Sequence, residues 1–258
     1  AVYQTENRFS QGKRNGEILY PMSKGKYVAL CDGDDYWTDP SKLQKQVDFL
    51  KKENDFSMCY TGATVIFNDQ VQIKNKNFGD SSQEDLIAGR GNAITGSVMF
   101  RKFDWFEWAQ LDIVNGDVLL WHFLGSYGQC KYLEDIDNTV YRIHQGGVWS
   151  GRSVTSRLVE NLKSYQVIRR RILKHYFDNE YILKKHDEIY PIIFINFFTE
   201  SGKRLNIANL VFGVKEINKL VFLTKKRVFY VFVIHILRSI YLFFGLDKVK
   251  KFLKKEWG

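Results

Sequence analysis

Three carboxylates fall within four residues near the start of the chain, at Asp32, Asp34 and Asp35. They directly follow an apolar run, residues 26–31, that is typical of a buried strand. Negative charges this close together repel one another unless a cation binds among them. Asp and Gly are also common in the turns that end strands. The cluster by itself therefore predicts either a turn or a site for a hard divalent metal such as Mg²⁺ or Mn²⁺.

The segments around this cluster predict alternating strands and helices. Asp39 and Pro40 predict a helix start, with Asp39 as the N-cap, and Leu43, Val47 and Leu50 form the apolar stripe of that helix. Further strands are expected at residues 56–61, 64–67, 71–73, 94–100, 130–133 and 139–143, and a second helix at 118–127. This order predicts an α/β sheet that binds ligands at the carboxyl ends of its strands, where the acidic cluster lies.

The charge of the chain is unevenly distributed. The whole chain has a net charge of +9, yet residues 1–150 hold 16 basic and 20 acidic side chains, so the positive excess lies after them. We therefore place a domain boundary near Gly151, which gives domains of residues 1–151 and 152–258. Three cysteines without C-x-x-C spacing exclude a disulfide scaffold and a zinc–thiolate site. No nucleic-acid-binding module accompanies the basic residues, so nucleic acid is excluded as the partner.

The basic second part has a helical pattern. Residues 152–185 predict a helix with apolar side chains on one face and Arg169, Arg170 and Arg171 on the other. Residues 228–244 are apolar, with Arg238 near the middle and lysines after them. We expect residues 218–258 to lie on a membrane surface, with a soluble helical bundle or a homo-oligomer contact as the alternative. A true span is the least favoured, because an Arg near the middle costs about 3 kcal/mol.

A known family shares the sequence around the carboxylates. The run GKYVALCDGDDYW at residues 25–37, with Asp39-Pro40 after it, resembles the family-two glycosyltransferases of the GT-A fold. Upstream, YQTEN at residues 3–7 resembles the preceding strand and turn of that family. Downstream, YRIH at 141–144 and GGVWS at 146–150 match a C-terminal signature of one bacterial branch. The resemblance covers residues 1–151 and implies a GT-A, Rossmann-like nucleotide-diphospho-sugar transferase sheet, N-terminally incomplete and followed by a helical extension.

The resemblance implies a metal site among these residues. The family transfers a sugar, with inversion, from a nucleoside-diphosphate donor to a hydroxyl of an acceptor, and Mn²⁺ or Mg²⁺ neutralises the leaving diphosphate. By resemblance, Asp34 is a direct metal ligand and Asp32 contacts the ribose or the metal. Asp35 either orients the loop or is solvated. His144 is favoured as a further metal ligand over a purely local hydrogen-bond partner.

The resemblance also implies residues that bind the substrates. Asp117 is the expected base for the acceptor hydroxyl, and capping its own helix is the simpler role. Thr95 and Gly96 are expected to line the acceptor side. Arg142 either reaches the diphosphate or forms a structural ion pair. Trp37 either stacks on a sugar or forms a buried wedge between the loop and the following helix.

These features together predict a glycosyltransferase in bacterial surface-polysaccharide synthesis. Its acceptor would be a saccharide or a lipid-linked saccharide, and it would act on the cytoplasmic side of the plasma membrane. The family's first strand, turn and helix have no counterpart before Tyr3, so we expect a piece of a longer protein or a truncated copy. The alternative hypothesis is a non-catalytic domain that binds a membrane or a partner.

Overall fold

The computed structural model describes residues 5–6, 16–104 and 116–189 of the chain, which forms two compact units, Ala1–His144 and Gln145–Gly258. The predicted boundary near Gly151 falls inside the second unit. The Gly151 N–H donates to the Gly147 carbonyl at 2.8 Å and closes a turn within that unit. The predictions for residues 3–4, 7, 105–115 and 190–258, including the apolar stretch 228–244, lie outside the described residues.

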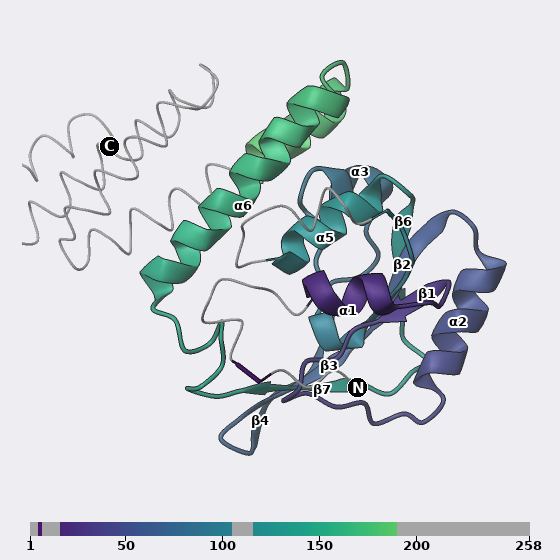
Figure 1. Cartoon of the computed structure of the whole chain (residues 1–258), viewed down its shortest axis with the longest axis vertical. Helices are drawn as coiled ribbons and strands as arrows, with labels where there is room; N and C mark the ends of the chain where they lie inside the picture. The colour runs from purple at the N-terminus through teal and green to yellow at the C-terminus, as the bar shows by residue number, and fades with distance from the viewer. Residues whose placement is uncertain (1–4, 7–15, 105–115, 190–258) are drawn as a thin grey trace, which may run out of the picture. The chain divides into compact units, whose positions relative to one another are not determined.

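The first unit contains two mixed sheets, so its class is mixed α/β, as the sequence predicts (Figure 1). The larger sheet has the order β1 (Tyr27–Ala29), β5 (Val98–Arg101), β2 (Phe56–Thr61) and β6 (Gln129–Leu133). Strand β5 is antiparallel to both neighbours, whereas β2 and β6 are parallel. The smaller sheet has the order β4 (Gln70–Lys76), β3 (Ala63–Phe67) and β7 (Thr139–Ile143), with β3 parallel to β7.

Helices pack on both faces of the larger sheet. On one face, Leu50 of α2 (Lys42–Lys52) forms a buried cluster with Cys59 and Met99. Because neighbouring strand residues point to opposite faces, Phe100 faces the other way and stacks on Tyr20 of α1 (Gly16–Met22), with ring centroids 6.1 Å apart. The other described helices of this unit are α3 (Gln83–Ile87) and α5 (Gly116–Gly125), which pack together.

Several predicted elements are confirmed. The predicted strands 56–61 and 139–143 are β2 and β7. The predicted hairpin is β3–β4, and Asn68 and Asp69 form its turn with φ angles of 48° and 59°. Asn and Asp tolerate this left-handed conformation better than most residues, which explains why they mark the turn in the sequence.

The helix α2 starts two residues later than predicted. It begins at Lys42 with Ser41 at its N-cap, although Ser41 makes no side-chain capping bond. The Asp39 carboxylate, the predicted cap, accepts a hydrogen bond from the Ser41 N–H at 2.7 Å, as a capping side chain does, and stabilises the turn that leads into the helix. The predicted stripe is also only partly correct, because Leu43 is exposed while Lys42 and Gln46 are buried with Leu50.

The predicted strand 94–100 is shorter than expected. Thr95–Ser97 form a 3₁₀ turn, η2, and β5 begins at Val98. The turn is closed by the Val98 N–H, which donates to the Thr95 carbonyl. This change of backbone direction brings Gly96 next to the loop that follows β1, as described below.

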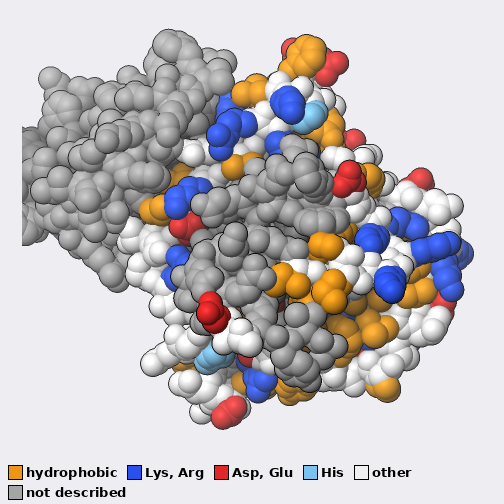
Figure 2. All heavy atoms as spheres, in the orientation of Figure 1, with side chains coloured by type: hydrophobic (Ala, Val, Ile, Leu, Met, Phe, Trp, Pro, Cys, Tyr) orange, Lys and Arg blue, Asp and Glu red, His pale blue; other side chains and the backbone are white. Residues whose placement is uncertain are grey.

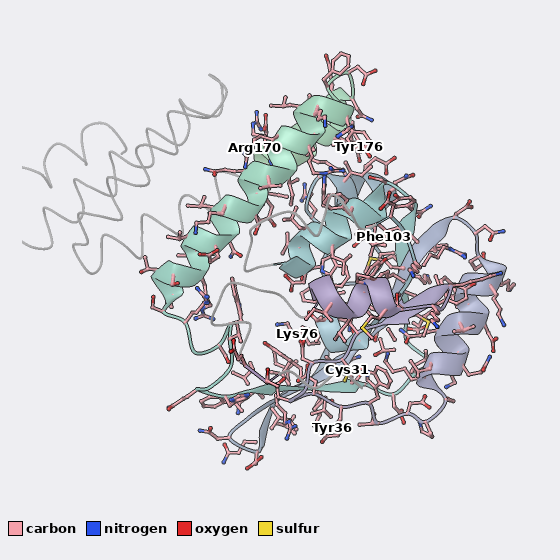
Figure 3. All side chains as sticks on the ribbon, in the orientation of Figure 1. Cys31, Tyr36, Lys76, Phe103, Arg170 and Tyr176 are labelled. Atoms are coloured by element: carbon pink, nitrogen blue, oxygen red, sulfur yellow. The ribbon has the colours of Figure 1, made fainter. Side chains whose placement is uncertain are left out.

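In the second unit, α6 (Val154–His175) has Ser153 as its N-cap, and the Ser153 side chain accepts from the Ser156 N–H. Basic side chains lie on this helix (Figure 2), and Arg170 is one of them (Figure 3). The prediction that Arg169 shares their exposed face is wrong, because Arg169 is buried and pairs with Asp187 in the helical segment 180–189. Over the part of the chain that the structure describes, no helix is both long and apolar enough to cross a membrane.

Candidate functional site

The three carboxylates lie on the loop that joins β1 to α2. The Asp35 N–H donates to the Asp32 carbonyl at 3.1 Å and closes a turn. The next residue, Tyr36, pairs with Val140 of β7 through two backbone hydrogen bonds of 3.3 and 2.9 Å. The loop therefore starts on the larger sheet and reaches the smaller one, which places its side chains beside β7.

A second set of contacts fastens the same loop to the connection between β6 and β7. The Thr38 hydroxyl donates to the Asn138 carbonyl at 2.7 Å. Lys45 donates both to the Asp39 carboxylate at 3.2 Å and to the Asp135 carbonyl at 2.8 Å. Hydrogen bonds from Ser41, and then from Lys45, lower the pKa of Asp39 to about 2. The position of the loop relative to β7 is thus set by several independent contacts.

This arrangement brings together Asp34 and His144, the two predicted metal ligands. His144 Nε2 and Asp34 Oδ2 are 2.9 Å apart although the residues are 110 positions apart in sequence. Their side chains are 46% and 43% exposed, so the pair lies at the protein surface and a ligand can reach it. Arg142, two residues before His144, donates through Nε to the backbone carbonyl of Asp34. Arg142 therefore supports the loop, and the residue is exposed overall.

Asp35 lies behind this pair and is only 8% exposed. Its Oδ1 accepts from the Arg142 N–H at 2.9 Å, whereas its buried Oδ2 has no hydrogen-bond partner. Burial raises the pKa of Asp35 to about 6, against the opposing hydrogen bond from Arg142, and the negative charges of Asp34 and Asp32 add to the rise. Of the two predicted roles for Asp35, orienting the loop therefore fits the structure and solvation does not.

Gly96 is adjacent to this buried carboxylate. A Cβ atom at position 96 would lie 3.2 Å from Asp35 Oδ2 and 3.3 Å from Thr139 Cγ2, closer than most side-chain contacts. Because glycine has no side chain, position 96 leaves room for the Asp35 carboxylate. The sequence had instead led us to expect that Gly96 lines the acceptor side of the site. Thr95, the neighbouring prediction, is partly buried in η2.

Of the two roles predicted for Trp37, the structure shows the wedge between the loop and the following helix. Its indole N–H donates to the Gly96 carbonyl at 2.7 Å, and the ammonium of Lys42 lies 4.6 Å from the centre of its ring. Lys42 is 1% exposed, donates to Gln46 Oε1 at 2.7 Å, and has its pKa lowered to about 8 by burial. These contacts fix Trp37 between the loop and α2.

Asp117, the predicted base, lies in the first turn of α5. Its Oδ1 accepts from the Val118 N–H at 2.8 Å, so it also stabilises the helix start. Burial raises the pKa of Asp117, the hydrogen bonds from backbone N–H groups oppose this, and the charge of Asp32 raises it further.

Tyr141 is a site residue that the sequence did not single out. It lies on β7 directly before Arg142 and is partly buried. Burial raises its pKa first, and the carboxylates of Asp35, Asp32, Asp117 and Asp34 raise it further, in that order. The phenol is therefore within electrostatic reach of all four carboxylates. Its position inside the YRIH run was the available signal, but a tyrosine in a strand is ordinary on its own.

Substituting Asp35 by Asn tests the electrostatics of the loop. Because the pKa of Asp35 is about 6 against an ordinary 3.8, the folded protein binds this proton more tightly than the unfolded chain does. Its contribution to stability is then complete below about pH 4 and is lost as the pH rises to about 6. Asn cannot ionise, so we expect Asp35→Asn to remove this loss and to be more stable than the unchanged protein at pH 8 by roughly 1–3 kcal/mol.

Urea unfolding across this pH range, without divalent cations, measures the difference. A bound cation would favour the ionised carboxylate, which is why none is added. The matched control is Asp69→Asn, an exposed carboxylate in the β3–β4 turn. If unchanged protein and Asp35→Asn show parallel stability profiles, the raised pKa of Asp35 is contradicted.

The donor groups of the site form an open arrangement. Within residues 5–6, 16–104 and 116–189, no group of three or more His, Cys, Asp and Glu side chains is placed to enclose a metal ion. What the structure offers is the Asp34–His144 pair with the other carboxylates of the loop close by. Such an arrangement can bind a cation only together with ligands from water or from a substrate.

The comparisons with known proteins give relatives but no activity. No protein-family model matches the chain. Curated proteins of Mycobacterium bovis and of two strains of Mycobacterium tuberculosis are each 33% identical to it over 142 residues, and all are described as uncharacterized. The match covers 52% of this chain and 40% of each relative, so the chain spans less than half the length of the curated relatives it matches. The chain thus shares a segment with mycobacterial proteins to which no function is attached.

Proposed function

We propose that this chain carries the metal-binding and catalytic residues of an inverting glycosyltransferase with a GT-A fold. The reaction transfers a sugar from a nucleoside diphosphate to a hydroxyl of a saccharide or of a lipid-linked saccharide. The observation that carries the proposal is the 2.9 Å contact between Asp34 and His144, with the guanidinium of Arg142 beside it. This combination offers ligands for a cation and a positive charge for a diphosphate at one place.

The residues present fit a Mg²⁺ or Mn²⁺ ion. Such ions are commonly held in proteins by one or two carboxylates, and substrate phosphates and water supply the remaining ligands. Asp34 and His144 would hold the ion, with Asp32 two residues away as a further oxygen ligand or a contact to the ribose. His144 must present an unprotonated nitrogen for this purpose, so binding the ion replaces its hydrogen bond with Asp34. When bound, the ion neutralises the charge that develops on the departing diphosphate.

The other residues bind and move protons. The guanidinium of Arg142 is fixed by its bond to the Asp34 carbonyl, and its terminal N–H groups would donate to diphosphate oxygens. Asp117 would accept the proton of the attacking hydroxyl. Its raised pKa makes its carboxylate a stronger base than that of an ordinary Asp, which suits this task. Asp35, buried behind the loop, would keep Asp34 and Arg142 in register through its bond to the Arg142 N–H.

Calorimetric titration of the chain with UDP and with GDP, each with and without Mn²⁺, tests the proposal. We expect at least one of the two nucleotides to bind only when the metal is present. We also expect the protein to hydrolyse the corresponding sugar nucleotide slowly. If neither nucleotide shows metal-dependent affinity, the proposal is contradicted. The non-catalytic hypothesis, a domain that binds a membrane surface through residues 218–258 or binds a partner, is then favoured.

A further inference from the structure

Tyr36 presents an exposed aromatic ring next to the candidate site. The residue is 47% exposed, although it directly follows the buried Asp35. In Figure 3 it lies below Cys31, on the side of the molecule where β7 runs. Single exposed aromatic side chains are common on protein surfaces, so exposure alone does not mark a site. What distinguishes Tyr36 is its position two residues after Asp34.

The ring of Tyr36 is held in place. Its backbone is bonded to Val140 in both directions, at 3.3 and 2.9 Å. The guanidinium of Arg142 lies 5.8 Å from the ring centroid, within the range of a cation–π contact. Arg142 is itself bonded to the Asp34 carbonyl. The backbone of Tyr36 is thus fixed relative to β7, and the contact with Arg142 favours one orientation of the ring, which lowers the ordering cost of binding a ligand there.

The neighbouring aromatic residue cannot take this role. Trp37 is less exposed than Tyr36, and the bond from its indole N–H to the Gly96 carbonyl holds it as a wedge between the loop and α2. Tyr36 has an exposed ring and a phenol that can donate to a sugar hydroxyl. The C–H groups on one face of a pyranose pack well on the negative face of an aromatic ring.

We propose that Tyr36 is the stacking platform for a pyranose ring and so a specificity-determining residue of this site. The inference rests on the proposed function for the identity of the ligand, a sugar of the donor or of the acceptor. Both sources share the same chemistry, a pyranose with an apolar face. The site would discriminate between sugars by which of their hydroxyls are axial. An axial hydroxyl on the stacked face of the sugar would hold that face away from the Tyr36 ring.

Saturation-transfer NMR with the intact chain and Mg²⁺ tests this proposal. The probes are methyl glycosides of glucose, galactose, mannose and N-acetylglucosamine, and the pairs UDP with UDP-glucose and GDP with GDP-mannose. We expect Tyr36→Ala to weaken binding of the preferred pyranose about two- to tenfold, the range that aromatic contacts contribute. Tyr36→Phe retains the ring and should bind the same glycoside. Tyr127→Ala, a tyrosine with similar exposure of 52%, is the matched control and should have no effect.

The outcomes separate the sources and the two proposals. If Tyr36→Ala binds the free glycosides more weakly than the unchanged protein does, the platform binds the acceptor sugar. If instead Tyr36→Ala shows a smaller difference in affinity between a sugar nucleotide and its free nucleotide, the platform binds the donor sugar. The inference is overturned if Tyr36→Ala binds all probes as well as the unchanged protein does. It is also overturned if Tyr127→Ala loses as much affinity for the probes as Tyr36→Ala. Metal-dependent affinity for UDP or GDP tests the proposed function alone. If the protein binds glycosides through Tyr36 but shows no such affinity, the stacking role of Tyr36 is supported and the proposed glycosyltransferase function is contradicted.

Discussion

Asp34→Asn is expected to weaken the Mn²⁺-dependent binding of UDP or GDP by a factor of about 100 or more, since even partners outside the first ligand sphere change metal affinity by about 10–100-fold. The amide keeps the size of the carboxylate and can still bond to His144 Nε2, now 2.9 Å from Asp34 Oδ2. What it removes is the negative charge and one ligand oxygen. Isothermal titration with each nucleotide, with and without the metal, measures the change.

Two further variants separate metal binding from folding. His144→Gln removes the imidazole from the same pair and should reduce metal-dependent affinity in the same direction. Asp69→Asn removes an exposed carboxylate in the β3–β4 turn, where Asn also tolerates the positive φ of 59°, and should have no effect. Asp34 and its partner are both nearly half exposed, so the urea midpoints of all variants should stay close together. Unaltered metal-dependent affinity in Asp34→Asn would remove the metal role of this residue.

Asp117→Asn is expected to lower the turnover number by about 10²–10⁴-fold, the usual contribution of a positioned base. Asn caps helices about as well as Asp, so the bond from the Val118 N–H and the start of α5 should survive. A residue that only capped the helix would therefore tolerate this change. Nucleotide release from sugar nucleotides, measured together with nucleotide affinity and the urea midpoint, distinguishes the two roles.

The pH dependence gives the same test an independent readout. A base must be deprotonated to act, so the rate of the unchanged protein should rise with pH through the pKa of Asp117 and then level off. Burial and the charge of Asp32 raise that pKa, so the rise should lie above the range of an ordinary Asp. Asp117→Asn should lose the rise, and Asp55→Asn, an exposed carboxylate before β2, should keep it. An unchanged rate and an unchanged profile in Asp117→Asn would exclude it as the base.

The sequence predicted those parts of the fold that local chemistry determines. The β3–β4 hairpin follows from Asn68 and Asp69, which tolerate positive φ, between two β-rich runs. Strands β2 and β7 follow from their short apolar runs. The proximity of Asp34 and His144 was expected only because a family resemblance linked two distant motifs, since nothing local relates residues so far apart.

The parts that the sequence missed depend on contacts between distant residues. Helix α2 buries Lys42 and Gln46 where the apolar pattern favoured Leu43, because Lys42 lies over Trp37 and Gln46 Nε2 donates to the Ser97 carbonyl at 3.0 Å. Arg169 is buried because Asp187 neutralises it. In each case a polar side chain left the surface for a specific partner, and hydrophobic periodicity carries no information about such partners.

The bond between Asp35 and the Arg142 N–H joins residues 107 positions apart, and this separation has a consequence for biosynthesis. A ribosome releases the acidic loop long before it releases β7, so the nascent loop exposes its charges without the contacts that later fix them. Closing so long a loop is entropically costly and slow. The parallel pairing of β3 with β7 has the same requirement, because β7 must be synthesised first. A nascent chain that ends before Thr139 therefore has the acidic loop but not the strand that organises it.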